Sequence, residues 1–531
     1  MTEHHHHPAP ALVRTCDVAI LGGSAAGLGA ALQLARQSRS VIVIDDGSPR
    51  NAPAAHMHGY LGHEGAAPSE LTAIGRDEVR SYGGEVLSGR VLGVTQESDG
   101  RFRVALTGGH ALVARRVVAA TGLVDVLPED IAGLAEHWGR DVIHCPFCHG
   151  FEVRDRRLVQ IVTHPMGLHP TPLLRHLTDR LTVVVHDGTE VDSASIDALA
   201  ASGVTVLRQP ARRVVTDPVG ALSGLELSDG TTIEADALVV GPRFAARAEV
   251  LSGLGLTATP HPTGLGDVVE VDPTGETSVP GLYAAGNLTD PGMQVLHAAA
   301  HGTRVGATVA FSLAEEDLRD GRRASGARAD WEHRYAGEDP VWSSNPNGSL
   351  VAEVGSLPAG RALDIGSGEG ADAIWLAERG WRVTASDISA NALARVGAEA
   401  ERRGVAVDLL HRDANALDAY EAGHYDLVSL QYGSFHRTPD GRGLRNLLGA
   451  VAPGGTLLVV AHDLAPMQEP IDVTTQTRMY DPTAYVGVDE IVAALVADPT
   501  WTIEVHEARP RPAGAVSTHH VDDVILRARR A

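Results

Sequence analysis

Cysteine is scarce in this chain, with three in 531 residues. Three cysteines cannot build the disulfide framework of a small secreted protein. Long apolar runs are missing too, since none approaches the roughly 18 residues that a membrane-spanning helix needs. The opening residues, MTEHHHHPAP, lack the apolar core of a signal peptide. We therefore expect a cytoplasmic protein that does not have a membrane as a partner.

Basic residues are outnumbered by acidic ones. The chain has 44 basic and 67 acidic residues and a formal net charge of −23, which repels a phosphate backbone. Nucleic acid is therefore not an expected partner. Hydrophobic residues make up 44% of the chain and the mean hydropathy is −0.04, which is typical of a globular protein. A chain of 531 residues exceeds one ordinary domain, so we expect three folding units.

Histidine occurs in two groups that lack the pattern of a metal site. The run His4 to His7 lies in a Pro-flanked terminus without neighbouring Cys, Asp or Glu, so we interpret it as a tail. Irregular spacing and the lack of acidic ligands characterise His144, His164, His169 and His176. The sequence therefore predicts no metal site.

Residues 17–47 have the pattern of a βαβ unit that binds a dinucleotide. A strand, a glycine turn, a helix and a second strand follow one another, and the second strand ends in acid. Gly22 permits the tight turn, Gly27 permits close packing of helix and strand, and the helix N-terminus faces the pyrophosphate. Asp45 is placed for the ribose hydroxyls. The predicted cofactor-binding residues here are Gly22, Gly23, Ser24, Gly27 and Asp45.

A second piece of the same domain lies much later in the chain. The run TSVPGLYAAGN is a short strand that ends at Gly286 and Asn287, and a helix of small residues follows. Between the two pieces, RLVQIV, LTVVVH and DALVV predict further strands, so another domain is inserted in the first. The polar run RDGRRASGARAD predicts a linker. The predicted boundaries are 1–129 with 239–318, then 130–238 for the insertion, 319–330 for the linker and 331–531 for a last domain.

The first 318 residues resemble the thioredoxin reductase-like flavoproteins in the order of their motifs. These motifs are the turn at Gly22, ATG at 120, Cys-x-x-Cys at 145 and GLYAAGN at 281. The resemblance implies FAD held by the first and third segments, with the cysteine pair facing the isoalloxazine ring. It implies that Asp45 holds the adenosine ribose, and that Gly286 and Asn287 lie near the ribityl chain and phosphates, where the family usually has an aspartate. A homodimer through the flavin domains is expected on the same basis.

The neighbouring cysteines, Cys145 and Cys148, indicate redox chemistry. A zinc site would need a second pair or matching histidines, and Cys16 is isolated. A helix that begins at the first cysteine lowers a thiolate pKa, so the pair can exchange with a disulfide and pass electrons to or from flavin. His149 stands where the family usually has a proton-shuttling acid, and an ordinary pKa of about 6.5 suits that task. The form Cys-Pro-Phe-Cys-His-Gly is similar to small-molecule dithiol oxidases of this family.

The inserted domain departs from the reductase pattern at its first turn. After RLVQIV come Thr163, His164 and Pro165, where a nucleotide-binding turn needs glycine. Side chains there block the approach of a phosphate to the backbone, and proline removes an amide donor. The next strand, LTVVVHDG, ends without the arginines that bind a 2′-phosphate. NADPH is therefore doubtful as a cofactor, and we expect electrons to come from a dithiol and to leave to oxygen or another acceptor.

Residues 361–370, RALDIGSGEG, predict a strand and a glycine turn that opens a helix. The form Asp-x-Gly-x-Gly-x-Gly, with an acid after the next strand, resembles class I S-adenosylmethionine-dependent methyltransferases. By this resemblance the glycines let the methionine portion lie against the backbone, Asp387 accepts the ribose hydroxyls and Asp413 lies beside the adenine. The residues predicted to bind S-adenosylmethionine are Asp364, Gly366, Gly368, Gly370, Asp387 and Asp413.

The same domain resembles, at its opening DWEHRY and its ending VDDVILRARR, the tellurite-resistance and thiopurine-type methyltransferases, which alkylate small, soft acceptors. No Asn-Pro-Pro-Tyr sequence follows the fourth strand, so a nucleobase or glutamine acceptor is not indicated. His436 or Tyr432, in the run QYGSFHR at that place, is a candidate base for an acceptor thiol. His436 is equally consistent with a packing residue, and His519 and His520 are ambiguous in the same way.

The predicted fold class is α/β, with two nested Rossmann-like βαβ domains of a thioredoxin reductase-like flavoprotein and a class I methyltransferase domain behind them. The leading hypothesis is a bifunctional enzyme that oxidises a small dithiol to a disulfide and methylates a small thiol. One alternative is an NADPH-dependent reductase of a thioredoxin-like protein with independent methylation. The other is a redox-sensing flavin module that regulates the methyltransferase.

Overall fold

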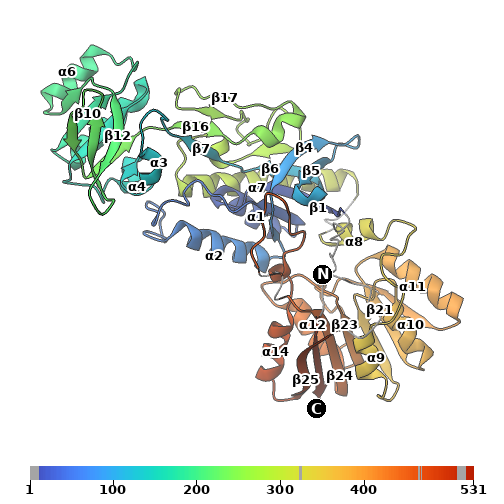
Figure 1. The fold of residues 1–531 in the computed structure, drawn as a ribbon. Coiled ribbons are helices and arrows are strands. Elements are labelled where there is room, and N and C mark those ends of the chain that lie inside the picture. The colour runs from blue at the N-terminus through green and yellow to red at the C-terminus, as the bar shows by residue number, and fades with distance from the viewer. Residues whose placement is uncertain (1–10, 322–325, 465–466, 468, 511–521) are drawn as a thin grey trace, which may run out of the picture.

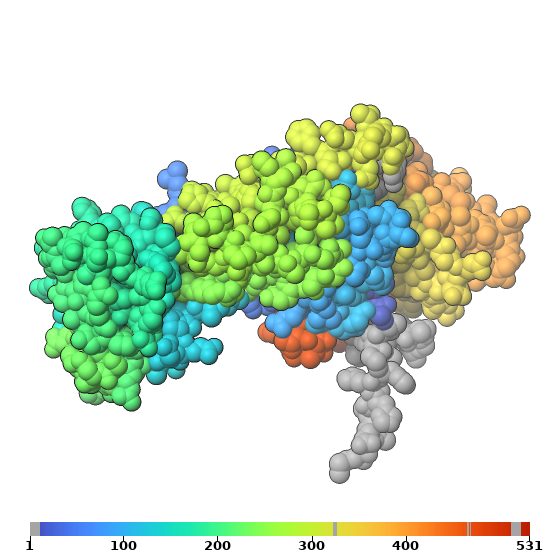
Figure 2. All heavy atoms as spheres, turned by 90° about the horizontal axis from the view of Figure 1, so that it is seen from above, coloured from blue at the N-terminus to red at the C-terminus, as the bar shows by residue number. Residues whose placement is uncertain are grey.

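The computed structural model has three α/β domains in a row (Figure 1). Seen from above, the inserted domain lies at one end of the row and the C-terminal domain at the other (Figure 2). The histidines at 4–7 and at 519 and 520 lie outside the described residues. The structure describes residues 11–321, 326–464, 467, 469–510 and 522–531.

The first domain is built on a mixed sheet in the order β3-β2-β1-β6-β5-β4. Strand β6 is long enough to carry two partners on its outer edge: β5 pairs antiparallel with its first half, and β19 pairs parallel with its second half. The early segment and the late segment of the chain therefore share one sheet. The described elements are β1 (Val13–Leu21), α1 (Ala25–Ala35), β2 (Val41–Asp45), α2 (Pro68–Ser81), β3 (Glu85–Ser88), β4 (Val91–Gln96), β5 (Phe102–Leu106), η1 (Thr107–Gly109), β6 (Ala111–Ala119), η3 (Glu249–Leu254), β17 (Thr259–Pro260), β18 (Asp267–Val268), β19 (Leu282–Ala284), η4 (Gly286–Leu288) and α7 (Val295–Arg319).

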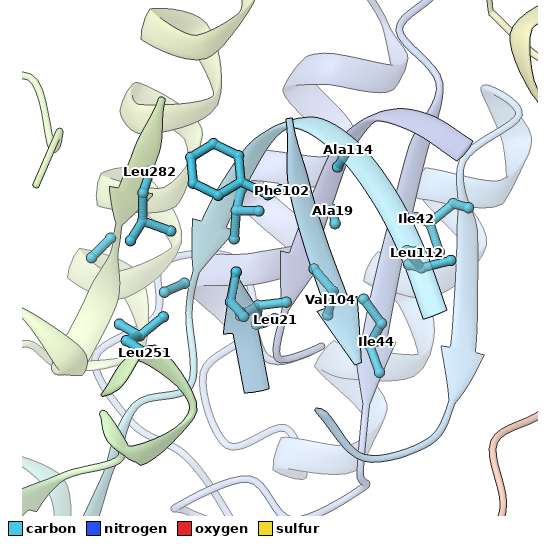
Figure 3. Packing of buried hydrophobic residues seen from close by; sticks show 14 of the residues in the cluster. Ala19, Leu21, Ile42, Ile44, Phe102, Val104, Leu112, Ala114, Leu251 and Leu282 are labelled. Atoms are coloured by element: carbon cyan, nitrogen blue, oxygen red, sulfur yellow. The ribbon is translucent and has the colours of Figure 1, made fainter. Parts of the chain in front are cut away.

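Apolar side chains from both segments fill the core of the first domain. Figure 3 shows Leu21 of β1, Phe102 of β5 and Leu282 of β19 on one face of the sheet. All three are fully buried, and each such side chain contributes about 1.5–3 kcal/mol relative to an exposed one. The other face is covered by α1 and α7, which pack closely because Gly302 of α7 lies against the backbone of Ala26.

The inserted domain has its own parallel sheet, in the order β11-β10-β9-β15-β8, and a small antiparallel sheet, β12-β13-β14. The chain enters and leaves through two strands that pair antiparallel with each other, β7 (Leu123–Val126) and β16 (Arg243–Ala246). The other described elements are α3 (Leu134–His137), β8 (Val142–Ile143), α4 (Pro146–His149), β9 (Leu158–Val162), η2 (Pro165–Leu168), α5 (Thr171–Leu177), β10 (Leu181–Val185), α6 (Ser193–Ala201), β11 (Thr205–Leu207), β12 (Ala211–Thr216), β13 (Leu222–Leu227), β14 (Thr232–Glu234) and β15 (Ala237–Val240).

The C-terminal domain is a doubly wound α/β domain. Its described strands form one sheet in the order β22-β21-β20-β23-β24-β26-β25, in which β26 runs antiparallel to its neighbours. The described elements are α8 (Arg328–Arg334), α9 (Gly348–Val354), β20 (Arg361–Ile365), α10 (Ala371–Glu378), β21 (Arg382–Asp387), α11 (Ala390–Arg403), β22 (Val407–His411), β23 (Tyr425–Gln431), α12 (Arg442–Ala450), β24 (Val451–His462), η5 (Pro482–Ala484), α14 (Val488–Ala497), β25 (Trp501–Pro510) and β26 (Asp522–Arg530). The predicted linker, 319–330, spans the end of α7 and the first turn of α8.

The C-terminal domain packs directly on the first domain. Residues 472–481 form an arm that reaches across to the first sheet, where the Arg478 amide donates to the Ser88 carbonyl at 2.8 Å. Met479 of the arm belongs to the buried core of the first domain. Helix α8 also lies against β1, because Asp330 accepts the Thr15 amide at 2.8 Å. The two domains therefore share buried contacts rather than only a connecting segment.

Strand β1 joins the two ends of the first domain. At its start, Arg14 lies buried against the C-terminal domain, and at its end the chain enters the glycine turn at Gly22. The eight residue steps between these positions span roughly 26 Å at the ordinary rise of a strand. None of the described helices is both long enough and apolar enough to cross a membrane.

Candidate active sites

The first cavity, of about 610 Å³, opens at the carboxyl ends of β1 and β2. Its lining joins the glycine turn after β1, the turn at Asn287, the cysteine pair and the altered turn of the inserted domain. Some of the residues predicted to bind FAD line this cavity: Gly22, Gly23, Ser24, Asp45 and Asn287.

The glycine turn after β1 is closed by backbone contacts that side chains would prevent. Gly22 has φ of 106°, and a Cβ there would lie 2.5 Å from the Ala120 carbonyl oxygen. Gly27, which is buried behind the turn, leaves no room for a Cβ against the Gly22 carbonyl. Ser24 caps α1 without a side-chain hydrogen bond to the helix, so the first amides of the helix remain directed to a ligand. These features fit a bound pyrophosphate.

Asp45 ends β2 beside the turn, and its side chain packs on Gly23. A Cβ on Gly23 would lie 2.7 Å from the Asp45 side chain. One of its oxygens, Oδ2, accepts a hydrogen bond from Arg76 of α2 at 2.5 Å. Oδ1 is held only by the Gly47 amide at 3.3 Å. Because each carboxylate oxygen has two lone pairs, the group can still accept ribose hydroxyls. Arg76 is a residue that the sequence pattern did not indicate.

The late turn lies on the other side of the same cavity. Gly286 has φ of 72°, and its amide donates to Nδ1 of His301 at 3.2 Å. The side-chain amide of Asn287 donates to the carbonyls of Asp290 and Met293 at 3.1 and 2.9 Å. Asn287 therefore shapes the loop before α7 as well as lining the cavity. Together with the open turn after β1, this lining fits an FAD molecule.

Cys145 precedes the single turn of α4 in the inserted domain, and Cys148 lies within it. Their Sγ atoms lie 2.6 Å apart, and the amides of Cys148 and His149 donate to the Cys145 carbonyl at 3.1 and 3.2 Å. The hydrogen bond from the Cys148 thiol, together with nearby backbone amides and the charge of Arg50, lowers the pKa of Cys145 to about 7 although burial opposes this. The same hydrogen bond and burial raise the pKa of Cys148. Cys145 is therefore the stronger nucleophile of the pair at neutral pH.

Two histidines border the cysteine pair. Burial, and then the charges of Arg50 and His149, lower the pKa of His144 to about 4, with Asp125 opposing the effect. Burial also lowers the pKa of His149, whose Nδ1 is buried without a hydrogen-bond partner in the described structure. A neutral imidazole with a free nitrogen can accept a thiol proton. Arg50, which pairs with Asp125 at 2.7 Å and lies 3.2 Å from His144 Nε2, was not indicated by the sequence.

The first turn of the inserted domain is filled. The hydroxyl of Thr163 donates to the Gly241 carbonyl at 3.3 Å, and His164 packs on Gly241, where a Cβ would lie 3.0 Å from its Nε2. The turn continues as a short 3-10 segment that begins at Pro165. Buried Gln160 of β9 donates to the Gly167 carbonyl at 2.6 Å and ties this segment to the sheet. A dinucleotide pyrophosphate does not fit against this turn as it does after β1.

The second cavity, of about 1250 Å³, lies at the carboxyl edge of the C-terminal sheet and against the start of β1 in the first domain. In the glycine turn after β20, the Gly368 amide donates to Oδ2 of Asp387 at 2.9 Å. The Ser389 amide donates to Oδ1 of the same carboxylate at 2.8 Å. Each oxygen retains a lone pair for a ribose hydroxyl. The residues predicted to bind S-adenosylmethionine that line this cavity are Asp364, Gly366, Gly368, Gly370, Asp387 and Asp413.

Buried polar atoms without hydrogen-bond partners gather around the second cavity. Such atoms are costly unless a ligand satisfies them. Burial, followed by the charges of Asp372 and Asp387, raises the pKa of Asp364 well above its ordinary value. In the described structure the unpartnered atoms that line this cavity are Thr15 Oγ1, Asp364 Oδ2, Ser367 Oγ, Asn415 Oδ1, Gln431 Oε1 and His436 Nε2. This donor and acceptor set fits S-adenosylmethionine together with a polar acceptor.

The two candidate bases of the second cavity have different surroundings. The hydroxyl of Tyr432 donates to Oδ2 of Asp523 at 2.6 Å, and Tyr432 has a positive φ of 50°. His436 stacks on Tyr485 with ring centroids 4.4 Å apart. Its Nε2 lies 3.6 Å from Oε1 of Glu85, a residue of the first domain. The sequence did not indicate Glu85, because its proximity depends on how two domains pack.

Among the described residues, no group of three or more His, Cys, Asp or Glu side chains comes together in a way that would hold a metal ion. His144, His164 and His169 all line the first cavity.

Comparison with known proteins matches two families along the chain. The family model for pyridine nucleotide-disulphide oxidoreductases matches residues 16–302, and the model for a methyltransferase domain matches residues 362–455. The chain is 31% identical over 318 residues to the thioredoxin reductase sirT of Leptosphaeria maculans, covering 57% of this chain and 95% of that protein. It is 30% identical over 282 residues to the thioredoxin reductase tcpT of Claviceps purpurea, covering 51% and 86%.

Solved structures resemble the same part of the chain. The crystal structure of HlmI has a TM-score of 0.55 and 38% sequence identity, and the match covers 59% of this chain and 97% of that one. The oxidoreductase from Agrobacterium tumefaciens has a TM-score of 0.53 and 34% identity, covering 57% and 99%.

Proposed function

The chain belongs to the family of pyridine nucleotide-disulphide oxidoreductases and carries a methyltransferase domain behind that part, and from this premise we propose its substrates and the direction of electron flow. The first activity oxidises a small dithiol to its disulfide with FAD. The second transfers a methyl group from S-adenosylmethionine to a small thiol.

The filled turn of the inserted domain is the observation that carries the direction of electron flow. A reductase that uses NADPH needs its pyrophosphate close to backbone amides after the first strand of this domain. Here Thr163 and His164 pack on Gly241, and Pro165 has no amide donor. The strand β10 is followed by His186 and Asp187, which present no cation to a 2′-phosphate. Electrons therefore enter through the cysteine pair.

The proposed oxidation balances two electrons and two protons. One thiol of the substrate attacks the disulfide of Cys145 and Cys148, and a mixed disulfide forms. The second substrate thiol then attacks the substrate sulfur of this mixed disulfide and releases the protein cysteine, which gives the substrate disulfide and the reduced pair. FAD, which the lining at Gly22, Ser24 and Asn287 would hold, would supply the two-electron oxidant that restores the disulfide of the pair, with oxygen as the final acceptor and hydrogen peroxide as its product. His149 accepts a thiol proton through its unpartnered Nδ1. Arg50 stabilises the Cys145 thiolate between the steps.

The proposed methylation uses the second cavity. His436 removes the proton of an acceptor thiol, and the thiolate forms a bond to the methyl carbon as the sulfonium bond of S-adenosylmethionine breaks. The products are a methyl thioether, S-adenosylhomocysteine and a proton. Both activities remove free thiols, and this shared chemistry is the reason for proposing related substrates.

A second candidate function follows from the similarity to proteins named thioredoxin reductase and from two aromatic side chains. Phe147 and Phe151, on either side of Cys148, are each 67% exposed. Exposed aromatics beside a reactive cysteine suit a protein partner, so a thioredoxin-like protein is the alternative substrate, reduced at the expense of a nicotinamide. A homodimer through the first domain stays a prediction.

The deciding experiment mixes the FAD-loaded full chain anaerobically with dithiothreitol or with NADPH while flavin absorbance is followed. Bleaching by dithiothreitol, its reversal by oxygen and the appearance of peroxide are expected. Bleaching by NADPH at a comparable rate would establish the reductase instead. The variant Cys16→Ser is the matched control for thiol chemistry, because Cys16 is buried in the core and lines neither of the two cavities.

Methyl transfer is measured in the same preparation with dithiothreitol and 2-mercaptoethanol as acceptors. Equal methylation rates with the cysteine pair oxidised and reduced are expected. A rate that follows the redox state of the pair, without flavin turnover, would favour the regulatory hypothesis.

A further inference from the structure

The second cavity is built by two domains. Its lining includes Arg14, Thr15, Tyr82, Gly83 and Glu85 of the first domain. Thr15 contributes one of the buried, unpartnered oxygens that border the cavity. The first domain is therefore part of the wall of the methyltransferase site, which contains the glycine turn and the candidate base.

Glu85 is placed at this wall by a buried ionic cluster. Arg14 of β1 donates two hydrogen bonds to the Glu85 carboxylate at 2.7 and 2.9 Å, and its Nε donates to Asp330 at 3.0 Å. The hydroxyl of Tyr485 donates to Oε1 of Glu85 at 3.0 Å. Burial alone would raise the pKa of Glu85, but the charge and hydrogen bonds of Arg14 outweigh it and hold the pKa well below its ordinary value. Glu85 is therefore an anion inside the interface.

His436 lies against this anion from the other domain. A Cβ on Gly83, at the turn before β3, would lie 3.1 Å from the Cβ of His436, so these two segments of the chain are in close contact. The His436 ring stacks on Tyr485. The main chain of His436 is fixed by Asn415, whose side-chain amide donates to the His436 carbonyl at 3.0 Å. The ring nitrogen nearest Glu85 is Nε2, at 3.6 Å, and it has no hydrogen-bond partner in the described structure.

We propose that Glu85 of the first domain is a positioning residue of the methyltransferase site, which holds the proton of His436 on Nε2 and so leaves Nδ1 to accept the proton of the acceptor thiol. A carboxylate that faces one nitrogen of an imidazole fixes its tautomer and stabilises the imidazolium that forms. The inference rests on the proposed function, in which His436 is the base. It assigns the flavoprotein half a part in the methyl transfer itself.

The ionic cluster around Glu85, which lies against His436, is assembled from several elements. Glu85 comes from β3 and Arg14 from β1, Asp330 comes from α8, and Tyr485 follows η5. Arg14 is balanced by Glu85 and Asp330 together, so removal of the Glu85 charge leaves Arg14 with one carboxylate partner. The imidazolium of His436 would then lose the anion nearest to its ring and keep a cation close by.

The direct test measures which ring nitrogen of His436 carries the proton, by ¹⁵N NMR of the full chain labelled at histidine. The signals are assigned as those that are missing in His436→Gln. In Glu85→Gln the share of the ring with its proton on Nε2 is expected to fall, because the carboxylate nearest this nitrogen is lost. Glu85→Asp keeps the charge, so it should fold and show a smaller change. An unchanged tautomer in both variants would overturn the proposal.

The matched control is Asp481→Asn. Asp481 is a buried carboxylate at the same interface, which accepts Arg80 Nε at 2.6 Å and the Val86 amide at 3.0 Å, but it does not line the cavity. This variant should lower the thermal midpoint of unfolding and leave the His436 tautomer unchanged. A change of the tautomer in Asp481→Asn equal to that in Glu85→Gln would show that general loosening of the interface is the cause, and would overturn the proposal.

Methyl transfer to dithiothreitol and 2-mercaptoethanol is then compared across the same variants. In Glu85→Gln the rate should fall roughly 10- to 100-fold, which is less than the roughly 100- to 10,000-fold contribution of a general base itself. The KM for S-adenosylmethionine should not change. If the His436 tautomer changes in Glu85→Gln but neither thiol is methylated by the parent protein, the pairing with Glu85 is supported and the thiol acceptor of the proposed function is wrong.

Discussion

The turns after β1 and after β9 occupy the same place in two nested domains, yet one is open and the other is filled. After β1, Gly22 and Gly27 leave the backbone accessible beside an uncapped helix. After β9, His164 packs on Gly241, and a 3-10 segment replaces the start of a helix. The comparison shows that one chain can carry two βαβ frames, one with an open glycine turn and one with a turn that side chains fill.

The largest effect is expected from the cysteine pair, because the filled turn leaves it as the entry for electrons. Cys148→Ser should reduce flavin bleaching by dithiothreitol at least about 1000-fold, since the disulfide can no longer form. Stopped-flow absorbance of the anaerobic protein measures this. Methyl transfer should continue in the variant, and bleaching that stays as fast as in the parent protein would show that dithiols reach flavin directly.

The open turn is tested by Gly22→Ala with Gly47→Ala as its control. Both residues have positive φ, which costs an alanine about 1 kcal/mol. A Cβ at Gly22 meets the Ala120 carbonyl at 2.5 Å, whereas a Cβ at Gly47 meets nothing within 4 Å. Gly22→Ala is therefore expected to lose most of its bound FAD, measured as absorbance per protein after gel filtration. Equal FAD content in the two variants would contradict a close approach at Gly22.

The filled turn is tested by His164→Gly, which empties the space against Gly241. The rate of flavin bleaching by NADPH should rise about tenfold in the variant and remain below the rate with dithiothreitol, because Pro165 still withholds an amide. His169→Gly is a control that removes another cavity histidine without opening Gly241. A fast NADPH reaction in the parent protein would end the contrast between the two turns.

The smallest effect concerns the pH dependence of the cysteine pair. The pKa of Cys145 is lowered to about 7, so its thiolate is present above that pH and is lost as the pH falls through it. Alkylation of the reduced protein by iodoacetamide should therefore be half-maximal near pH 7. In Cys148→Ala the midpoint should move up, because the thiol hydrogen bond is the largest cause of the lowering. A midpoint that stays in place would assign the shift to Arg50 and the backbone amides.

The sequence predicted those parts of the sites that are local. The glycine turns at Gly22 and Gly366 and the acids that end the next strands follow from spacing along one βαβ unit, and the structure lines its cavities with them. The fold class is confirmed for the same reason, since alternating strands and helices fix the layers. The filled turn was also readable, because it rests on the residues Thr163 to Pro165 in one short run.

The contacts that sequence analysis missed join segments that are far apart. Arg50 lines the first cavity from a loop, and Arg76 of α2 contacts Asp45, which lines it; neither position carries a signal in the sequence pattern. The pairing of Glu85 with His436 depends on the docking of two domains by the arm at 472–481. No periodicity or motif records such a docking, so only coordinates reveal it.

Strand β1 also separates the two cavities in space. The first cavity lies at its carboxyl end and the second at its amino end, and the described linings have no residue in common. Under the proposed function, a molecule released at the cysteine pair leaves one cavity and reaches His436 in another that is built from different residues. Under the proposed function the fusion sets the two catalysts at a one-to-one ratio, and a scavenger of free thiols added to the solution would compete for every molecule that passes between them.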